Sequence, residues 1–319
     1  MTETASIYGP VAEDVPAVGE RLRHLATGRN SFLGEALSYV FQSHGKQIRP
    51  ALVLLCGRLG EYRRDDLLTL AASLEAVHTA TLVHDDTIDG ARTRRGLKTV
   101  SALWDSKVAI LVGDFLFAQS AELAAQLESV RIMSLLSETV MAMSSGELQQ
   151  YAATRARSID EDDYYERIRG KTASLFSMCC EGAAVITGQN EEHVRALREY
   201  GLNLGLAFQI ADDVLDFTSD SETLGKPAGN DFREGTITLP VILLANDLPP
   251  GSALLNDIET GAHPDEVVRM VAASDHLERA SQRARHYAQM AVSALEVFPR
   301  SAAKEALVQM TEIVTTRSS

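Results

Sequence analysis

Two aspartate-rich segments with the same spacing hold the residues best suited to chemistry in this sequence. Each segment reads Asp-Asp-x-x-Asp after an apolar run, and the second begins 127 positions after the first (212 minus 85). On a helix, the first and last aspartates of a segment lie one turn apart on one face, and the middle one is swung about 100° away. The residues are Asp85, Asp86 and Asp89 in the first segment, and Asp212, Asp213 and Asp216 in the second.

These carboxylates indicate a metal site. Like charges one turn apart weaken a helix by roughly a few tenths of a kcal/mol, so a cation is expected to offset them. Carboxylate oxygens suit Mg²⁺, which keeps several waters and binds through one or two carboxylates plus substrate phosphates. A solvated acidic helix end would explain one such segment. Two copies, each after an apolar run, favour metal binding.

Composition limits the partners that the chain can have. The 319 residues are 45% apolar and 23% charged, which is enough for a sizeable core, and the net charge is −14. That charge argues against a nucleic-acid partner and against docking on anionic membranes. Residues 1–10 show no signal-peptide pattern, and no uninterrupted apolar run reaches roughly 18 residues, so we expect a cytoplasmic protein without a membrane span.

The distribution of proline predicts an all-α fold. No proline lies between Pro50 and Pro227, a length over which strands and turns would ordinarily bring some. We expect a single domain over 1–319, with 1–14 as a flexible N-terminal segment and 219–235 as the longest internal loop. The predicted helices cover 15–30, 50–60, 67–89, 99–126, 129–154, 161–187, 191–219, 236–247 and 264–275, with a last pair over 277–315.

Short basic clusters bracket the two aspartate segments, as binding of phosphate groups to an acidic chain requires. Lys46 and Arg49 lie at the expected start of a helix, whose free N–H groups also favour anions. Arg94 and Arg95 follow the first aspartate segment. Each of these residues alone is most simply a surface residue, but their placement around the carboxylates favours a phosphate-containing substrate. Two further lysines complete the set, Lys171 and Lys226.

The ordered set of motifs resembles the trans-isoprenyl diphosphate synthases, or polyprenyl synthetases. The resemblance extends from about residue 40 to 245 by motif and is weaker beyond. Besides the two aspartate segments, the matching pieces are Gly45-Lys46-x-x-Arg49-Pro50, Glu75-x-x-His78, Arg94-Arg95-Gly96, Gly113-Asp114, Gly146-Glu147-x-x-Gln150, Lys171-Thr172, Phe208-Gln209, Lys226 and Thr238-Leu239-Pro240.

The resemblance implies a bundle of long helices around a central cavity, the isoprenoid synthase fold, with the aspartate segments facing each other at its mouth. It implies three Mg²⁺ ions per active site, bound most directly by Asp85, Asp89 and Asp212 and assisted by Asp86, Asp213 and Asp216. Arg94, Lys171 and Lys226 would hold the allylic diphosphate with the metals. Lys46, Arg49, His78 and Arg95 would hold isopentenyl diphosphate, and Thr172 and Gln209 would lie by the reacting carbons.

The implied reaction is a head-to-tail condensation of isopentenyl diphosphate with dimethylallyl, geranyl, farnesyl or geranylgeranyl diphosphate. The allylic C1–O bond ionises, the isopentenyl double bond attacks the cation, and a proton is lost to the departing diphosphate. Two positions depart from the family pattern. His44 stands where a second glycine is usual, and Thr236 stands where bacterial relatives often have a lysine.

Two alternatives remain open. A class I terpene synthase shares the first aspartate segment and the all-α fold, but its second metal site is normally an Asn/Ser/Glu pattern and it has no use for Lys46 and Arg49. A non-catalytic partner subunit would typically have lost aspartates, whereas all six are present here. A requirement for a separate heteromeric partner is left open. Family members are mostly homodimers, and the apolar residues spread around the predicted helix 99–126 also favour one.

The product is predicted to be long, C30 or more, with geranylgeranyl diphosphate (C20) as the alternative. The stripe Leu70, Leu74, Val77, Thr81 and Asp85 advances by three or four residues along one helix face, where a growing chain would descend over roughly 22 Å. In short-chain relatives an aromatic residue four or five positions before the first aspartate blocks this path. Ala80 and Thr81 occupy these positions here. Bulky residues elsewhere could close the path instead, and the candidates are Phe115, Phe117 and Met141.

Overall fold

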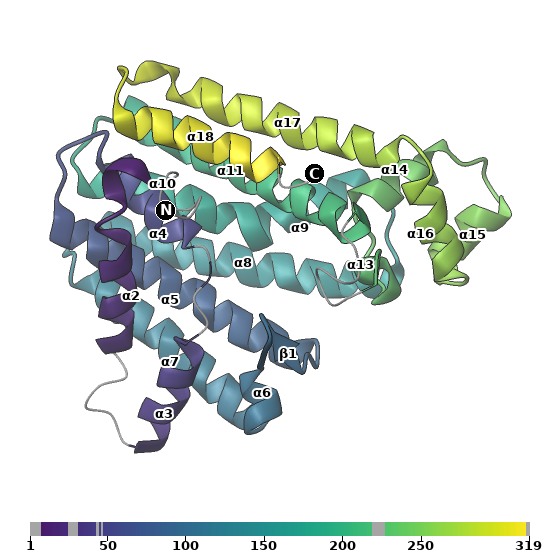
Figure 1. Cartoon of the computed structure of the whole chain (residues 1–319), viewed down its shortest axis with the longest axis horizontal. Coiled ribbons are helices and arrows are strands. Elements are labelled where there is room, and N and C mark those ends of the chain that lie inside the picture. The colour runs from purple at the N-terminus through teal and green to yellow at the C-terminus, as the bar shows by residue number, and fades with distance from the viewer. Residues whose placement is uncertain (1–7, 25–30, 43–44, 46, 219–226, 317–319) are drawn as a thin grey trace. The chain divides into compact units, whose positions relative to one another are not determined.

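The computed structural model describes residues 8–24, 31–42, 45, 47–218 and 227–316. Long helices dominate it, as the proline pattern predicted (Figure 1). The chain divides into two compact units, and four of the five boundaries between them fall within helices. Unit 1 comprises Met1–Glu138, Met178–Leu197 and Phe298–Leu307, and unit 2 comprises Thr139–Ser177, Arg198–Val297 and Val308–Ser319. The single domain stays a prediction.

Unit 1 is built around two long apolar helices, α5 (Arg64–Ile88) and α7 (Ser106–Ala125), which lie side by side (Figure 1). Gly113 allows their close approach, since a Cβ there would lie 2.1 Å from His84 Nε2. Both helices are long and apolar enough to cross a membrane, a test that buried core helices also pass. The other elements are η1 (Gly9–Val11), α2 (Val15–His24), α3 (Ser31–Val40), α4 (Ile48–Gly57), α6 (Val100–Leu103) and the first part of α8 (Val130–Ala156).

The buried carboxylate of Asp14 links the N-terminal region to the rest of unit 1. Asp14 accepts hydrogen bonds from Tyr62 Oη and Arg64 Nε, both at 2.6 Å. Burial raises the pKa of Asp14, but these bonds and the charges of Arg64 and Arg58 outweigh it, so the pKa lies below its usual value. Residues 8–14, predicted as part of a flexible segment, are instead packed, because Val11 and Asp14 are buried. Residues 1–7 lie outside the described chain.

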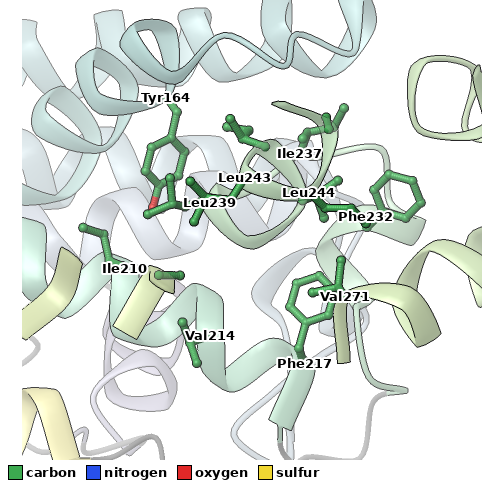
Figure 2. Packing of buried hydrophobic residues seen from close by; sticks show 14 of the residues in the cluster. Tyr164, Ile210, Val214, Phe217, Phe232, Ile237, Leu239, Leu243, Leu244 and Val271 are labelled. Atoms are coloured by element: carbon green, nitrogen blue, oxygen red, sulfur yellow. The ribbon is translucent and has the colours of Figure 1, made fainter. Parts of the chain in front are cut away.

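Unit 2 has its own hydrophobic core, formed around α14 (Leu239–Asp247) and the second half of α11 (Glu191–Thr218) (Figure 2). Every residue of α14 from Leu239 to Ala245 is buried, and Pro240 lies in its first turn, where the missing N–H has no cost. The remaining elements of unit 2 are α9 (Glu161–Ile168), a π-helical turn (Arg169–Ala173), α13 (Asn230–Arg233), α15 (Ala253–Thr260), α16 (Pro264–Ala272), α17 (His276–Ala294) and η3 (Leu295–Val297). Two further helices have residues in both units, α10 (Ser174–Ile186) and α18 (Ala302–Thr316).

Several predicted boundaries differ from the structure for local reasons. The helix predicted over 99–126 is broken at Trp104, because Asp105 turns extended and caps a new helix by accepting from Val108 N at 2.8 Å. The segment 161–187 is interrupted by the π-helical turn. Three α-helices, α3, α13 and α15, were not predicted. Residues 25–30 and 219–226 lie outside the described chain.

A short hairpin was also missed. Strands β1 (Thr93–Arg94) and β2 (Leu97–Lys98) pair antiparallel, with Thr93 opposite Lys98. The two residues between them, Arg95 and Gly96, both have positive φ, at 50° and 79°. That conformation is the two-residue turn that matches the twist of paired strands. The hairpin fixes where the two arginines after the first aspartate segment lie.

Candidate active site

The first aspartate segment ends α5, and the helix separates its carboxylates as the spacing predicts. Asp89 is the exposed C-cap and Asp85 is half-buried, whereas Asp86 is only 7% exposed. Asp86 Oδ1 accepts from Arg94 Nε at 2.7 Å, so the hairpin supplies this buried charge with a cation. The predicted metal role of the three aspartates stays a prediction. Arg94, predicted to hold a diphosphate, lies in an ion pair here.

A pocket opens beside this segment, along the face of α5 that carries Glu75, His78 and Leu82. Its walls combine apolar side chains with a cationic and acidic lining, and all of it belongs to unit 1. The hairpin contributes the arginines, and α5 contributes residues of one face. The polar lining includes Gln47, Glu75, His78, Asp86, Arg94 and Arg95, and the apolar lining includes Leu22, Phe41, Leu82, Val83 and Leu97.

Charged side chains around His78 define the chemistry of this pocket. Burial lowers the pKa of His78 well below its usual value, and the cations Arg49, Arg95 and Arg94 add to the effect. The imidazole is therefore neutral at neutral pH, and its Nε2 lies 3.1 Å from Arg49 Nη1. Burial raises the pKa of Glu75, while Arg49 and Arg95 oppose that rise. The lining holds three cations, Arg94, Arg95 and Lys98, and two carboxylates, Glu75 and Asp86, so its net charge favours an anion.

A glycine makes room for the hairpin arginine. A Cβ on Gly45 would lie 2.8 Å from both terminal nitrogens of Arg95. The first residue of the Gly45 motif is therefore needed for the close approach of that guanidinium. Its neighbour Lys46, predicted to bind isopentenyl diphosphate, lies outside the described residues, as does His44.

The second aspartate segment lies in α11 within unit 2. Asp212 is exposed and Asp216 is half-buried, whereas Asp213 is 3% exposed. Asp216 Oδ2 accepts from Asp231 N at 3.2 Å. Burial raises the pKa of Asp213 to about 8. The charge of Asp231 adds to this effect, and hydrogen bonds from Tyr164 and Gln209 oppose it. The metal roles of these aspartates also stay predictions.

Lys171 and Thr172 lie on the π-helical turn, an element that is rare and often found at functional sites. Lys171 Nζ forms an ion pair with Glu147 Oε2 at 2.5 Å and donates to Gln150 Oε1 at 3.2 Å. The Gly146-Glu147-x-x-Gln150 motif thus holds the lysine. Gly146 itself has no room for a side chain, since a Cβ would lie 2.5 Å from Lys171 N.

Within each unit, the structure brings one group of predicted residues together. His78 and Arg95 line the pocket, Arg49 contacts His78, and Thr172 contacts Gln209. Lys226 lies outside the described residues, and the predicted apposition of the two aspartate segments stays a prediction. Sequence reasoning gave no role to Tyr164, although its position eight residues before Thr172 could have marked it as part of the same helical stretch.

The arrangement of the acidic side chains limits how Mg²⁺ could bind. Within residues 8–24, 31–42, 45, 47–218 and 227–316, no group of three or more His, Cys, Asp or Glu side chains is close enough to form a metal cage. Mg²⁺ does not need such a cage, because water and substrate phosphates complete its shell. The accessible oxygens of Asp85, Asp89 and Asp212 therefore fit the ion.

Comparison with known proteins decides the family. Residues 30–274 match the family described as Polyprenyl synthetase. The chain belongs to that family. A Synechocystis protein named prenyl transferase is 37% identical over 98% of both chains, and heptaprenyl diphosphate synthase component 2 of Geobacillus stearothermophilus is 36% identical over 94% of both. The enzyme class, prenyltransferase, follows from this membership.

Solved structures of polyprenyl synthetases confirm the fold. A decaprenyl diphosphate synthase from Rhodobacter capsulatus superposes with a TM-score of 0.91 at 34% identity over 99% of both chains. A polyprenyl synthase from Caulobacter crescentus, complexed with calcium and isoprenyl diphosphate, gives a TM-score of 0.90 at 34% identity over 99% of this chain and 98% of that one. The all-α isoprenoid synthase fold predicted from the sequence is confirmed.

Proposed function

We propose that this chain is a Mg²⁺-dependent all-trans polyprenyl diphosphate synthase with products of C30 or longer. It would join isopentenyl diphosphate head to tail to an allylic diphosphate. The observation that carries the proposal is the pocket of unit 1, where the guanidiniums of Arg49 and Arg95 near a neutral His78 fit a diphosphate that no metal accompanies. A synthase needs this second diphosphate site, and a terpene cyclase does not.

The pocket would hold isopentenyl diphosphate. Arg49 and Arg95 would bind its phosphates through charge-assisted hydrogen bonds, which are about twice as strong as neutral ones. The neutral imidazole of His78 can donate one N–H without adding charge. Leu82, Val83 and other apolar wall residues would receive the five-carbon tail. Lys46 is proposed as a further ligand from the family resemblance.

Asp85, Asp89, Asp212 and Asp216 would hold the ions that accompany the allylic diphosphate. Bound Mg²⁺ would neutralise the diphosphate as a leaving group. The Caulobacter relative, complexed with calcium and isoprenyl diphosphate, supports a divalent ion at this kind of site. Three Mg²⁺ ions are proposed on family grounds. Lys171, oriented by Glu147 and Gln150, would contact the same diphosphate, as would Lys226.

The chain's own residues would then position the reacting carbons. The C1–O bond of the allylic substrate breaks and the diphosphate leaves with the electron pair. The isopentenyl double bond forms the new C–C bond, and a proton is lost to the departing diphosphate. Thr172 and Gln209 would present oxygen dipoles to the developing cation, the kind of preorganised stabilisation that lowers barriers most.

Long products are proposed because the α5 stripe above Asp85 has small residues where short-chain relatives have aromatics. Val77 and Ala80 are fully buried, and the Thr81 hydroxyl donates to His78 O at 2.8 Å. The named relatives include heptaprenyl and decaprenyl synthases, which supports this choice over the C20 alternative. Met141, one of the bulky residues that could close this path instead, has a side chain that is 61% exposed.

A homodimer is proposed from the surface of α7. One face of this helix packs on α5, and another leaves Ile110 and Leu111 about half exposed, at 49% and 59%. Light scattering at micromolar concentration should give twice the chain mass, and a monomer would contradict the proposal. One relative is named as component 2 of a heptaprenyl synthase, so activity of the purified chain alone would decide whether a heteromeric partner is needed.

Incubation with farnesyl diphosphate, excess isopentenyl diphosphate and Mg²⁺, followed by sizing of the products, tests the function. We expect chains of C30 or longer. Asp85→Asn should lower turnover by several orders of magnitude, because a ligand of the ion at the leaving group is lost. Asp162→Asn, at an exposed position of α9, is the matched control. Products that stop at C20 would refute the long-chain choice. A hydrocarbon formed without isopentenyl diphosphate would favour the terpene synthase.

A further inference from the structure

We propose that Tyr164 and Asp213 are positioning residues that orient Gln209 and, through it, the hydroxyl of Thr172 toward the allylic cation. This inference rests on the proposed function and deepens it. It assigns a role to Tyr164, a buried tyrosine outside the sequence motifs. It also gives Asp213 a task different from metal binding.

An unbroken chain of hydrogen bonds links the four side chains. Tyr164 Oη donates to Asp213 Oδ2 at 2.6 Å, and Gln209 Nε2 donates to Asp213 Oδ1 at 2.9 Å. Thr172 Oγ1 donates to Gln209 Oε1 at 2.7 Å. Both oxygens of the Asp213 side chain therefore accept from protein groups. All four residues belong to unit 2.

The carboxylate decides which way the amide of Gln209 points. Gln209 Nε2 donates to Asp213 Oδ1 and Gln209 Oε1 accepts from Thr172 Oγ1, so the NH₂ end of the amide faces Asp213 and the carbonyl end faces Thr172. The hydroxyl hydrogen of Thr172 is then committed to that carbonyl. The lone pairs of Thr172 Oγ1 remain to face the substrate, which suits a cation and not an anion.

The direction of donation reinforces this effect. Each donor in this chain of hydrogen bonds points its hydrogen toward Asp213, so the bond dipoles align in one sense from Asp213 out to Thr172. Hydrogen bonds in such chains strengthen one another inside a protein. The oxygen of Thr172 would gain electron density through this polarisation without contact between Asp213 and the substrate.

Tyr164, at one end of this chain of hydrogen bonds, is enclosed and remote from solvent. Tyr164 is 1% exposed and lies in the hydrophobic cluster of unit 2, where its hydroxyl oxygen is drawn in red (Figure 2). The guanidinium of Arg167 lies 5.5 Å from the centre of its ring, and the ring of Tyr165 packs edge-on at 5.3 Å. A residue so enclosed acts on the reaction only through Asp213.

The two aspartates at the start of the segment thus have different surroundings. Asp212 is exposed and can reach an ion, whereas Asp213, about 100° around the helix, faces Tyr164. Asp86 in the first segment is likewise buried and bonded to the protein, there by Arg94. The middle aspartate of each segment is a contact to the protein interior.

Kinetics of Tyr164→Phe test the proposal, with Tyr165→Phe as the matched control. Both changes remove one tyrosine hydroxyl from α9, but only Tyr164 bonds to Asp213. We expect Tyr164→Phe to lower kcat about 10-fold, less than the loss for a group that touches the transition state. KM for each substrate and the half-saturating Mg²⁺ concentration should stay within about 2-fold, and Tyr165→Phe should behave like the unmodified protein.

A double-mutant cycle separates positioning from a merely structural role. In a Gln209→Ala background the path from Tyr164 to the substrate is cut, so Tyr164→Phe should cause no further loss of kcat. Additive losses would overturn the proposal. So would an unchanged kcat, or a raised Mg²⁺ requirement with kcat restored at saturating Mg²⁺, because the latter would make Asp213 a metal ligand.

A second variant keeps the test valid if Tyr164→Phe does not fold. Asp213→Asn keeps the side-chain shape but turns one acceptor into a donor, and it should lower kcat with the Mg²⁺ requirement unchanged. An unmodified protein that does not elongate farnesyl diphosphate would overturn the proposed function and the catalytic role of this chain of bonds together. An active protein with an unaffected Tyr164→Phe variant would overturn the positioning role alone.

Discussion

Replacement of Gly146 by alanine should separate the activity of this protein from its stability. Gly146 lies in α8 where that helix meets the π-helical turn with Lys171 and Thr172. A Cβ at this position would lie 2.5 Å from Lys171 N, 3.0 Å from Arg167 O and 3.1 Å from the Gly170 carbonyl carbon. All three are backbone atoms, so no side chain can swing aside to make room.

The size of the effect follows from this geometry. Ordinary contact begins at 3.4 Å, so the two backbones must separate by about 0.9 Å (3.4 minus 2.5). Overpacking of this kind costs about 1–3 kcal/mol, and the better helix propensity of alanine offsets about 1 kcal/mol. The net loss of unfolding free energy is therefore about 0–2 kcal/mol. A displacement of about 1 Å at a substrate-positioning residue can lower turnover about 100-fold.

Turnover with farnesyl and isopentenyl diphosphates, together with urea unfolding, measures both quantities. Gly182→Ala is the matched control, since Gly182 also lies within a helix but its Cβ would meet the flexible end of Leu70 at 3.2 Å. That variant should keep its turnover. A Gly146→Ala protein with turnover within about 3-fold of the unmodified protein would refute the claim that the contact between α8 and the π-helical turn sets the position of Lys171.

Three further outcomes are expected. Asp14→Asn should lower the unfolding free energy by about 1–3 kcal/mol at pH 7. Because the folded-state pKa of Asp14 is depressed, its contribution is present above pH 4 and is lost as the pH falls through that folded pKa, so urea unfolding at pH 7 and pH 3 should differ less in the variant. Gly113→Ala should displace His84 from α7 and cost about 1–3 kcal/mol of thermal stability, as calorimetry would show. Thr81→Phe should shorten the product seen by chromatography, and unchanged product length would contradict the proposed path along α5.

The helix faces could be predicted from the sequence because they depend on local spacing. The separation of Asp86 from Asp85 and Asp89, and the end of α5 near Gly90, follow from the 3.6-residue period and from helix-terminating chemistry. The all-α class followed from proline spacing for the same reason. Predictions of this kind need no knowledge of what packs against the helix.

Partners distant in the sequence could not be predicted. The bond from Tyr164 to Asp213 joins residues 49 positions apart, and no periodicity within either helix indicates it. The π-helical turn packs closely against Gly146 of another helix, and the hairpin at Arg95 and Gly96 depends on two positive φ values in a dipeptide that is not a common turn sequence. These features are set by tertiary packing, which overrides local preference.

Because of the π-helical turn, the number of residues in this segment also determines the geometry of the active site. The turn closes with a bond from Ser174 N to Arg169 O, one residue wider than an α-helical turn. Every residue from Ser174 onward is therefore rotated by about 100° about the helix axis, compared with its position in an uninterrupted helix that begins at Glu161. Deletion of one residue here would restore a regular helix and rotate Lys171 and Thr172 relative to α10. A chimera between relatives must therefore preserve the number of residues in this segment as strictly as their identities.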